Sequence, residues 1–248
     1  MKIYSILRCI GYVFAWVILV QIVSVLCHNT TATMAGSIVI MGALSLYSVR
    51  KNRYIIFSHG EKLQRQMPLS LLMGVGLAFF NAVSIVLYIL GGNFESMLEM
   101  VSADHFLFLF LSSIAGAVAE ELFFRGVLLN ICRPCFSAGF AIGIPALIFA
   151  VFHLAPERML HTLIGGLLFG AVYYYTENIF TSVVMHAVTN VVASVPVGYL
   201  FALIGTKTGY LPAALLLTLA GLVTILCASV VFYREFVRGV KEGGEESG

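Results

Sequence analysis

Long apolar runs restrict what this sequence can fold into more than any other feature. Eight of them, most about 20 residues long, follow one another along the chain, at 10–27, 34–49, 69–90, 106–131, 138–154, 159–175, 180–203 and 211–233. A helix of about 20 apolar residues crosses the hydrocarbon core of a bilayer, and helices satisfy their own backbone groups there. The pattern therefore predicts an all-α fold, a polytopic membrane helix bundle of about eight transmembrane helices.

Composition argues against a soluble domain. Hydrophobic residues make up 60% of the 248 residues and charged residues only 10%, against about 45–50% and about 25% in an ordinary soluble domain. The formal net charge of +2, with no basic run interleaved with aromatic residues, gives no reason to expect a nucleic-acid partner. We expect a multi-pass protein of the cell membrane whose main partner is the lipid bilayer.

The distribution of lysine and arginine predicts the orientation. These residues concentrate in short cytoplasmic loops. With the N-terminus inside, the cytoplasmic side holds Lys2, Arg8, Arg50, Lys51, Arg53, Lys62, Arg65, Arg133, Arg234, Arg238 and Lys241, and the opposite side only Arg158 and Lys207. Both termini are therefore predicted to be cytoplasmic, with an even number of spans.

No second folded domain is visible, so the chain is divided into three parts of a single helix bundle. Residues 1–104 are read as N-terminal transmembrane helices, 105–204 as the core that carries the chemistry, and 205–248 as the last transmembrane helix and a cytoplasmic tail. The polar stretch 50–67 is read as a loop or interfacial segment, and the tail 234–248 as mobile.

Three charged residues lie inside the fourth apolar run: Glu120, Glu121 and Arg125. Each would cost about 2.5–3.5 kcal/mol at the centre of a bilayer, so they are expected to face the protein interior or a wet cavity. On a helix Glu121 and Arg125 lie about 40° apart and can pair, whereas Glu120 lies about 100° from Glu121 and can meet another helix. The alternative is a purely structural ion pair between helices.

Polar residues that could meet Glu120 occur in two later runs. The fifth run ends in Phe149-x-x-x-His153, and the seventh contains His186-x-x-x-Asn190. A spacing of four places Phe149 against the His153 ring and puts His186 and Asn190 on one helix face, where both could donate to one point. By position along the helices, His153 would lie on the order of 10 Å from the depth of Glu120, so we expect the turn 154–158 to be sunk inside the protein.

These motifs resemble a known family. Glu120-Glu121-x-x-x-Arg125, then Phe149-x-x-x-His153, then His186-x-x-x-Asn190 are similar in order and spacing to the CAAX protease and bacteriocin-processing family, also called CPBP or Abi. Its members include the type II CAAX prenyl endopeptidases, which are intramembrane glutamic proteases. Further similarities are Gly126 and Leu128 after the first motif, Gly165, Gly166 and Gly170 on the intervening helix, and Thr181 and Ser182 before the last motif.

Peptide hydrolysis needs an activated water, stabilisation of the oxyanion and a proton for the leaving amine. Glu120 and His153 could hold and deprotonate the water, while His186 and Asn190 could donate to the oxyanion. The resemblance implies the same assignment, with Glu121 and Arg125 positioning the site. The predicted activity is therefore cleavage of a membrane-associated peptide or protein by an intramembrane endopeptidase that needs no cofactor.

A zinc-dependent variant is the first alternative. Glu120, His153 and His186 would form a two-histidine, one-carboxylate zinc shell, although the His-Glu-x-x-His helix of most zinc peptidases is missing. The single Cys132-x-x-Cys135 pair has no second pair or nearby histidine, so reduced thiols beside a proline turn are expected there. The five cysteines are an odd number and predict no disulfide framework.

Two further alternatives belong to other functional classes. A non-proteolytic immunity or scaffold protein of the same family would use the polar cluster for packing, and the completeness of the catalytic set argues against it. A proton-coupled transporter would use the intramembrane ionisable groups as a relay, but no internal repeat is visible. Nothing in the sequence selects the substrate.

Overall fold

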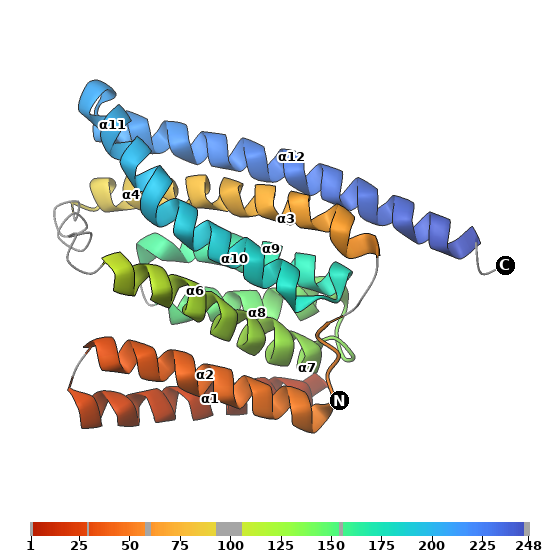
Figure 1. Ribbon diagram of the computed structural model, residues 1–248. Helices are drawn as coiled ribbons and strands as arrows, with labels where there is room; N and C mark the ends of the chain where they lie inside the picture. Colours follow the sequence, from red (N-terminus) through yellow and green to blue (C-terminus); the bar gives the residue numbers. More distant parts are fainter. Residues whose placement is uncertain (1, 29, 58–60, 93–105, 154–155, 246–248) are drawn as a thin grey trace.

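The computed structural model describes residues 2–28, 30–57, 61–92, 106–153 and 156–245, and within these ranges it is helical apart from short connections (Figure 1). The elements are α1 (Lys2–Cys27), α2 (Thr30–Asn52), α3 (Glu61–Phe80), α4 (Ala82–Leu90), α6 (Phe106–Phe123), η2 (Phe124–Leu129), α7 (Asn130–Cys132), α8 (Ala138–Phe152), α9 (Pro156–Thr176), α10 (Ile179–Val192), η3 (Ala193–Val197), α11 (Gly198–Thr208) and α12 (Tyr210–Glu245). The all-α membrane bundle predicted from the sequence is confirmed.

Every predicted apolar run coincides with helix. Four helices in the described part of the chain are long and apolar enough to cross a membrane, and Ala138–Phe152 and Ile179–Val192 are shorter apolar helices. The four long ones are Lys2–Cys27, Thr31–Asn52, Gln66–Leu90 and Tyr210–Glu235. Eight passes remain a prediction, because the shorter helices cross a bilayer only where it is locally thinner or where other parts of the protein surround their ends.

The helices form three groups that run roughly along one direction (Figure 1). The hairpin α1–α2 lies on one side and packs on α6 through α2. Helices α6, α8, α9 and α10 occupy the middle, and α3, α4 and α12 cover the opposite side, where α3 packs against α12 and α10. Both ends of the chain lie at the same end of the bundle (Figure 1), as an even number of passes requires.

Two π-helical segments interrupt the middle helices, one at the end of the first sequence motif and one just after the last. The first, η2, follows the two glutamates and contains Arg125. The Asn130 side chain bonds the carbonyls of Arg125 at 3.3 Å and Gly126 at 3.0 Å, and the Tyr173 hydroxyl at 2.7 Å. The second, η3, follows Asn190 and contains Pro196, which has no backbone N–H for a regular helix. Such segments are frequent at functional sites.

Two helices extend into segments that the sequence analysis did not assign to helices. The polar segment 50–67, read as a loop or interfacial segment, is partly helical, because α2 continues to Asn52 and α3 begins at Glu61. The helix α12 continues beyond its apolar run to Glu245, and the mobility of 234–248 stays a prediction. Basic and acidic residues after the apolar part of this helix have high helix propensity, which lets the helix extend beyond the span.

Candidate active site

The buried ion pair predicted on the fourth run is present. Arg125 Nη1 donates to Glu121 Oε1 at 2.8 Å, one helical turn apart. The side chains are 1% and 0% exposed. Because a buried charge is tolerated only when it is paired and hydrogen-bonded, this pair explains how a carboxylate and a guanidinium can occupy an apolar run.

The rest of the Arg125 guanidinium is held by α9 and by aromatic rings. Its Nη2 donates to the Gly166 carbonyl at 3.0 Å, and it lies 5.1 Å from the Phe149 ring centre and 5.3 Å from that of Phe169. A Cβ on Gly166 would lie 3.1 Å from Ala146 of α8. Glycine at this position therefore allows α8 and α9 to approach closely while its carbonyl reaches the arginine.

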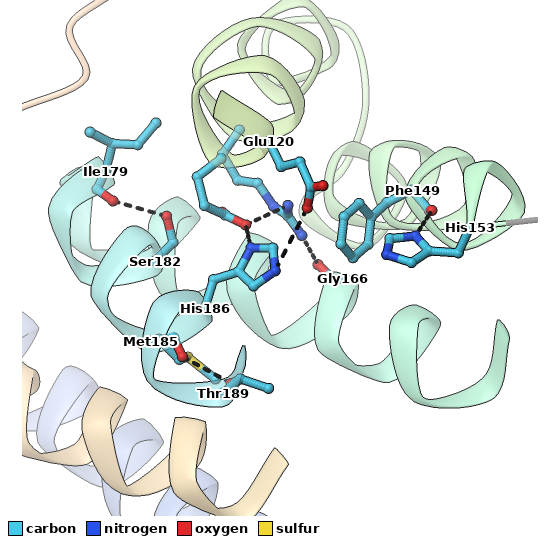
Figure 2. A network of polar contacts seen from close by, with 11 residues as sticks. Glu120, Phe149, His153, Gly166, Ile179, Ser182, Met185, His186 and Thr189 are labelled. Atoms are coloured by element: carbon cyan, nitrogen blue, oxygen red, sulfur yellow. Dashed lines mark hydrogen bonds and ion pairs between the residues drawn. The ribbon is translucent and has the colours of Figure 1, made fainter. Parts of the chain in front are cut away.

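His186 links the two glutamates. Its Nδ1 lies 2.9 Å from Glu121 Oε1, and its Nε2 lies 3.7 Å from Glu120 Oε2 (Figure 2). Phe169 stacks on the His186 ring at 4.6 Å with the planes 20° apart. Since Glu121 is paired with Arg125 and can only accept, Nδ1 of His186 carries a proton, and Nε2 is a donor only when the ring is doubly protonated.

Glu120 and Glu121 carry two negative charges when ionised, and Arg125 carries one positive charge. A proton either on Nε2 of His186 or on Glu120 would balance the remaining charge.

Glu120 differs from Glu121 in its exposure. Its side chain is 29% exposed, and it borders a cavity of about 450 Å³. The cavity is lined by Trp16, Met34, Ser37, Ile38, Met41, Gly116, Ala119, Glu120, Phe124, Phe149, Phe152 and His153. One glutamate is thus locked in the interior and its neighbour is available, as the helical geometry predicts.

His153 lines the same cavity as Glu120, although their positions along the helices predicted an offset in depth. It stands at the C-terminal end of α8, and Phe149 packs on its ring at 4.7 Å as expected. Nδ1 lies 2.9 Å from the Phe149 carbonyl, which can only accept. Nδ1 therefore carries a proton, so a singly protonated ring has its lone pair on Nε2. The sunk turn expected at 154–158 falls partly outside the described residues.

Asn190 faces α6, as His186 does, but the two do not meet at one point. The Asn190 amide donates to the Ser113 carbonyl at 3.2 Å, whereas His186 bonds Glu121, eight residues further along the same helix. A helical carbonyl uses one lone pair for its backbone hydrogen bond, so the Ser113 carbonyl can accept the Asn190 amide with the second. The oxyanion role of these two residues therefore stays a prediction.

Several residues of the site were not found from the sequence. Phe169 has no signal beyond being one apolar residue in an apolar run, yet it stacks on His186. Trp16 is the only tryptophan of the chain, and it packs on Phe152 at 5.1 Å beside the cavity. The contribution of the α1–α2 hairpin to the cavity wall required the tertiary fold, because no local pattern relates residues 16–41 to residue 120.

Gly116 lies about one turn before Glu120 on α6, and small residues often let another helix approach closely. A Cβ there would meet nothing within 4 Å, and the residue borders the cavity instead. Its small size opens space next to Glu120 rather than closing a helix contact.

The zinc shell does not assemble from this geometry. Within the described residues, no three His, Cys, Asp or Glu side chains are close enough together to hold a metal ion. Nδ1 of His186 is engaged by Glu121 and Nδ1 of His153 by a backbone carbonyl, so zinc would need both Nε2 atoms and Glu120 to converge further.

A comparison with known protein families gives a match in the middle of the chain. Residues 102–192 match the family model described as type II CAAX prenyl endopeptidase Rce1-like. This segment is similar to the Rce1-like family. It contains all seven site residues predicted from the sequence, and at family level it supports a CAAX-type intramembrane protease. Searches of curated proteins and of solved structures return no match for the chain.

Proposed function

We propose that this chain is an intramembrane glutamic endopeptidase of the cell membrane, which hydrolyses a peptide bond in a membrane-associated peptide or protein. The observation that carries the proposal is the contrast between two adjacent glutamates. Glu121 is fully buried and paired with Arg125, while Glu120 borders a cavity that His153 also lines. A carboxylate that reaches both a cavity and a histidine is suited to general base catalysis.

In this proposal Glu120 and the Nε2 lone pair of His153 hold the attacking water. Glu120 takes a proton as the water oxygen adds to the carbonyl carbon, and it passes that proton to the leaving amine when the C–N bond breaks. His153 is suited to accept a hydrogen bond from the water because its Nδ1 proton is already donated to the Phe149 carbonyl. The residues of this chain supply the chemistry, and no step requires a metal.

His186 would stabilise the negative charge that develops on the carbonyl oxygen. With a proton on both ring nitrogens it would offer Nε2–H on the side of Glu120, and Glu121 and Phe169 fix the orientation of the ring. A preorganised donor of this kind contributes on the order of 10²–10³ in rate. Asn190 would join it by exchanging its bond to the Ser113 carbonyl for one to the oxyanion.

The cavity favours a substrate with a large apolar group beside the scissile bond. Its wall is formed mainly by methionine, isoleucine, tryptophan and phenylalanine side chains. A volume of about 450 Å³ lies in the range of about 300–1,000 Å³ typical of small-molecule sites. Methionine is adaptable in shape and suits such a wall.

The proposal is tested by comparing the peptides in membranes that contain the native chain with those that contain Glu120→Gln. A membrane-associated substrate should yield cleavage products only with the native chain, at equal expression of both. The same products from the Glu120→Gln membranes would refute the glutamic mechanism. Metal analysis of the purified, active chain separates the zinc-dependent alternative, since activity without stoichiometric zinc excludes it.

A further inference from the structure

The cysteine pair next to the proline turn has a third cysteine close to it. Cys132 lies on α7, and its Sγ is 3.7 Å from Sγ of Cys9 on α1, 123 residues earlier in the chain. Cys9 is 1% exposed and Cys132 is 0% exposed. Both are reduced in the structure. A Cys-x-x-Cys motif without a partner in the sequence therefore acquires one through the packing of α1 against α7.

Cys135 is placed differently from the other two. It is half-buried, and its sulfur accepts a hydrogen bond from Ser5 Oγ at 3.1 Å. In the described part of the chain, these cysteines form no group that could hold a metal ion. The close sulfur pair is therefore suited to covalent bonding between two thiols rather than to metal binding.

We propose that Cys9 and Cys132 are a site of oxidative modification, where a peroxide converts the two thiols into a disulfide that fixes α1 to α7. A disulfide has a sulfur–sulfur distance of about 2.05 Å, so the two sulfurs must approach by less than about 2 Å. Such a movement is within reach of two side chains already in contact.

The chemistry balances with the peroxide as the oxidant. One thiolate attacks the peroxide oxygen, which breaks the O–O bond, forms a sulfenic acid and releases water when hydrogen peroxide is used. The second thiol attacks the sulfenic sulfur, forms the S–S bond and releases a second water. Two thiols and one hydrogen peroxide thus give one disulfide and two waters, and a dithiol reductant reverses the change.

The position of the bond connects it to the cavity. Cys9 and Trp16 are seven residues apart, which is about two helical turns, so they lie on nearly the same face of α1. That face contacts Cys132 at one position and Phe152 at the other, and both lie in the matched segment 102–192. A covalent bond at Cys9 would hold α1 against this segment and restrict movement of the cavity wall that Trp16 contributes.

Counting the free thiols of the chain before and after oxidation tests whether the Cys9–Cys132 disulfide forms. The chain in detergent is treated with hydrogen peroxide, denatured, labelled with N-ethylmaleimide and weighed by mass spectrometry. The reduced chain should take five labels, one per cysteine, and the oxidised chain three, because the bond removes two. An oxidised chain that still takes five labels would overturn the proposal.

Single variants identify the partners. Cys135→Ser, with four cysteines, should fall from four labels to two on oxidation, whereas Cys9→Ser should stay at four. Loss of two labels in Cys9→Ser would instead indicate a Cys132–Cys135 bond and contradict the proposal. Cys9→Ala is a second variant at the buried position, which keeps the site apolar if serine disturbs packing. Cys27→Ser, at an exposed cysteine, is the matched control and should still lose two labels.

The effect on cleavage rests on the proposed function and is measured separately. Oxidised native chain should cleave its substrate more slowly than the reduced chain, dithiothreitol should restore the rate, and Cys9→Ala should not respond to peroxide. An unchanged rate with the bond formed would refute the restriction of the cavity wall. If the reduced chain cleaves nothing, the proposed function fails, while the thiol count still decides whether the bond forms.

Discussion

Arg125 compensates the buried negative charge of Glu121. It pairs with Glu121, donates to the Gly166 carbonyl, and lies among the rings of Phe149 and Phe169. Glu121 in turn fixes the Nδ1 side of His186. The orientation of the histidine that faces Glu120 is therefore set by a guanidinium that does not face the cavity itself, which makes Arg125 a positioning residue.

Removing this guanidinium should destabilise the fold. In Arg125→Met the Glu121 carboxylate stays buried without its partner, and breaking a buried pair in this way costs about 3–5 kcal/mol. We expect a clearly lower thermal unfolding temperature in detergent. The double variant Glu121→Gln with Arg125→Met should recover part of the loss, because no uncompensated carboxylate remains. An unchanged unfolding temperature in Arg125→Met would contradict the account of the ion pair.

At the residue scale, much of the site could be predicted because charges are rare in this chain. Glu120, Glu121 and Arg125 stand out in an apolar run, and helical geometry alone separates the paired from the available glutamate. Phe169 could not be predicted, because one phenylalanine in an apolar run looks the same whether it faces lipid or a histidine. The bond from Asn190 to a backbone carbonyl also has no sequence signal, since every helix offers such acceptors.

At the scale of elements, apolar length predicts where helices lie but not where they break. All eight runs are helical, yet the third is divided between α3 and α4 and the seventh contains η3. The π segment η2 follows the glutamates. It contains no proline, and Gly126 is the one residue in it that is typical of a break in a helix. The carbonyls of Arg125 and Gly126 accept hydrogen bonds from the Asn130 side chain, and this contact depends on the three-dimensional fold.

The hairpin α1–α2 should influence which substrates are cleaved. Met41 lines the cavity on α2, so Met41→Trp should narrow it and lower kcat/KM for a peptide with a large apolar group by about tenfold or more, while a peptide with a small group is affected less. A difference of one methylene group in an apolar pocket is worth about 10–200-fold. Leu46→Trp is the matched control, because Leu46 is on the same helix but 47% exposed.

The two peptides are compared on each variant in parallel. Leu46→Trp should retain the preference of the native chain between them. Equal effects of Met41→Trp on both peptides, or the same shift from Leu46→Trp, would show that the hairpin does not select the substrate.

At the scale of the whole molecule, the distribution of basic residues and the fold agree on the arrangement of the chain. Both ends lie at one end of the bundle (Figure 1). Arg8 near the N-terminus donates to Asn52 at the end of α2 at 3.0 Å, so the predicted cytoplasmic segments gather together. The sidedness itself depends on insertion into a bilayer, which is why it is a prediction from the basic residues alone.

Native cysteines allow that sidedness to be measured. Cys27 is exposed where α1 ends, whereas Cys135 contacts Ser5 near the start of the same helix. In intact expressing cells, a membrane-impermeant maleimide should label a variant that keeps only Cys27. A variant that keeps only Cys135 should be labelled only after permeabilisation. The reverse pattern would invert the predicted topology.

The central claim is that Glu120 activates the water while the adjacent Glu121 maintains the structure. The most direct measurement is the rate of peptide cleavage by purified Glu120→Gln and Glu121→Gln, together with their thermal unfolding in detergent. Glu120→Gln should lose about 10²–10⁴-fold in kcat, as expected for loss of a general base, and unfold like the native chain. Glu121→Gln should unfold at a lower temperature. A folded Glu120→Gln chain that cleaves at the native rate would contradict the account.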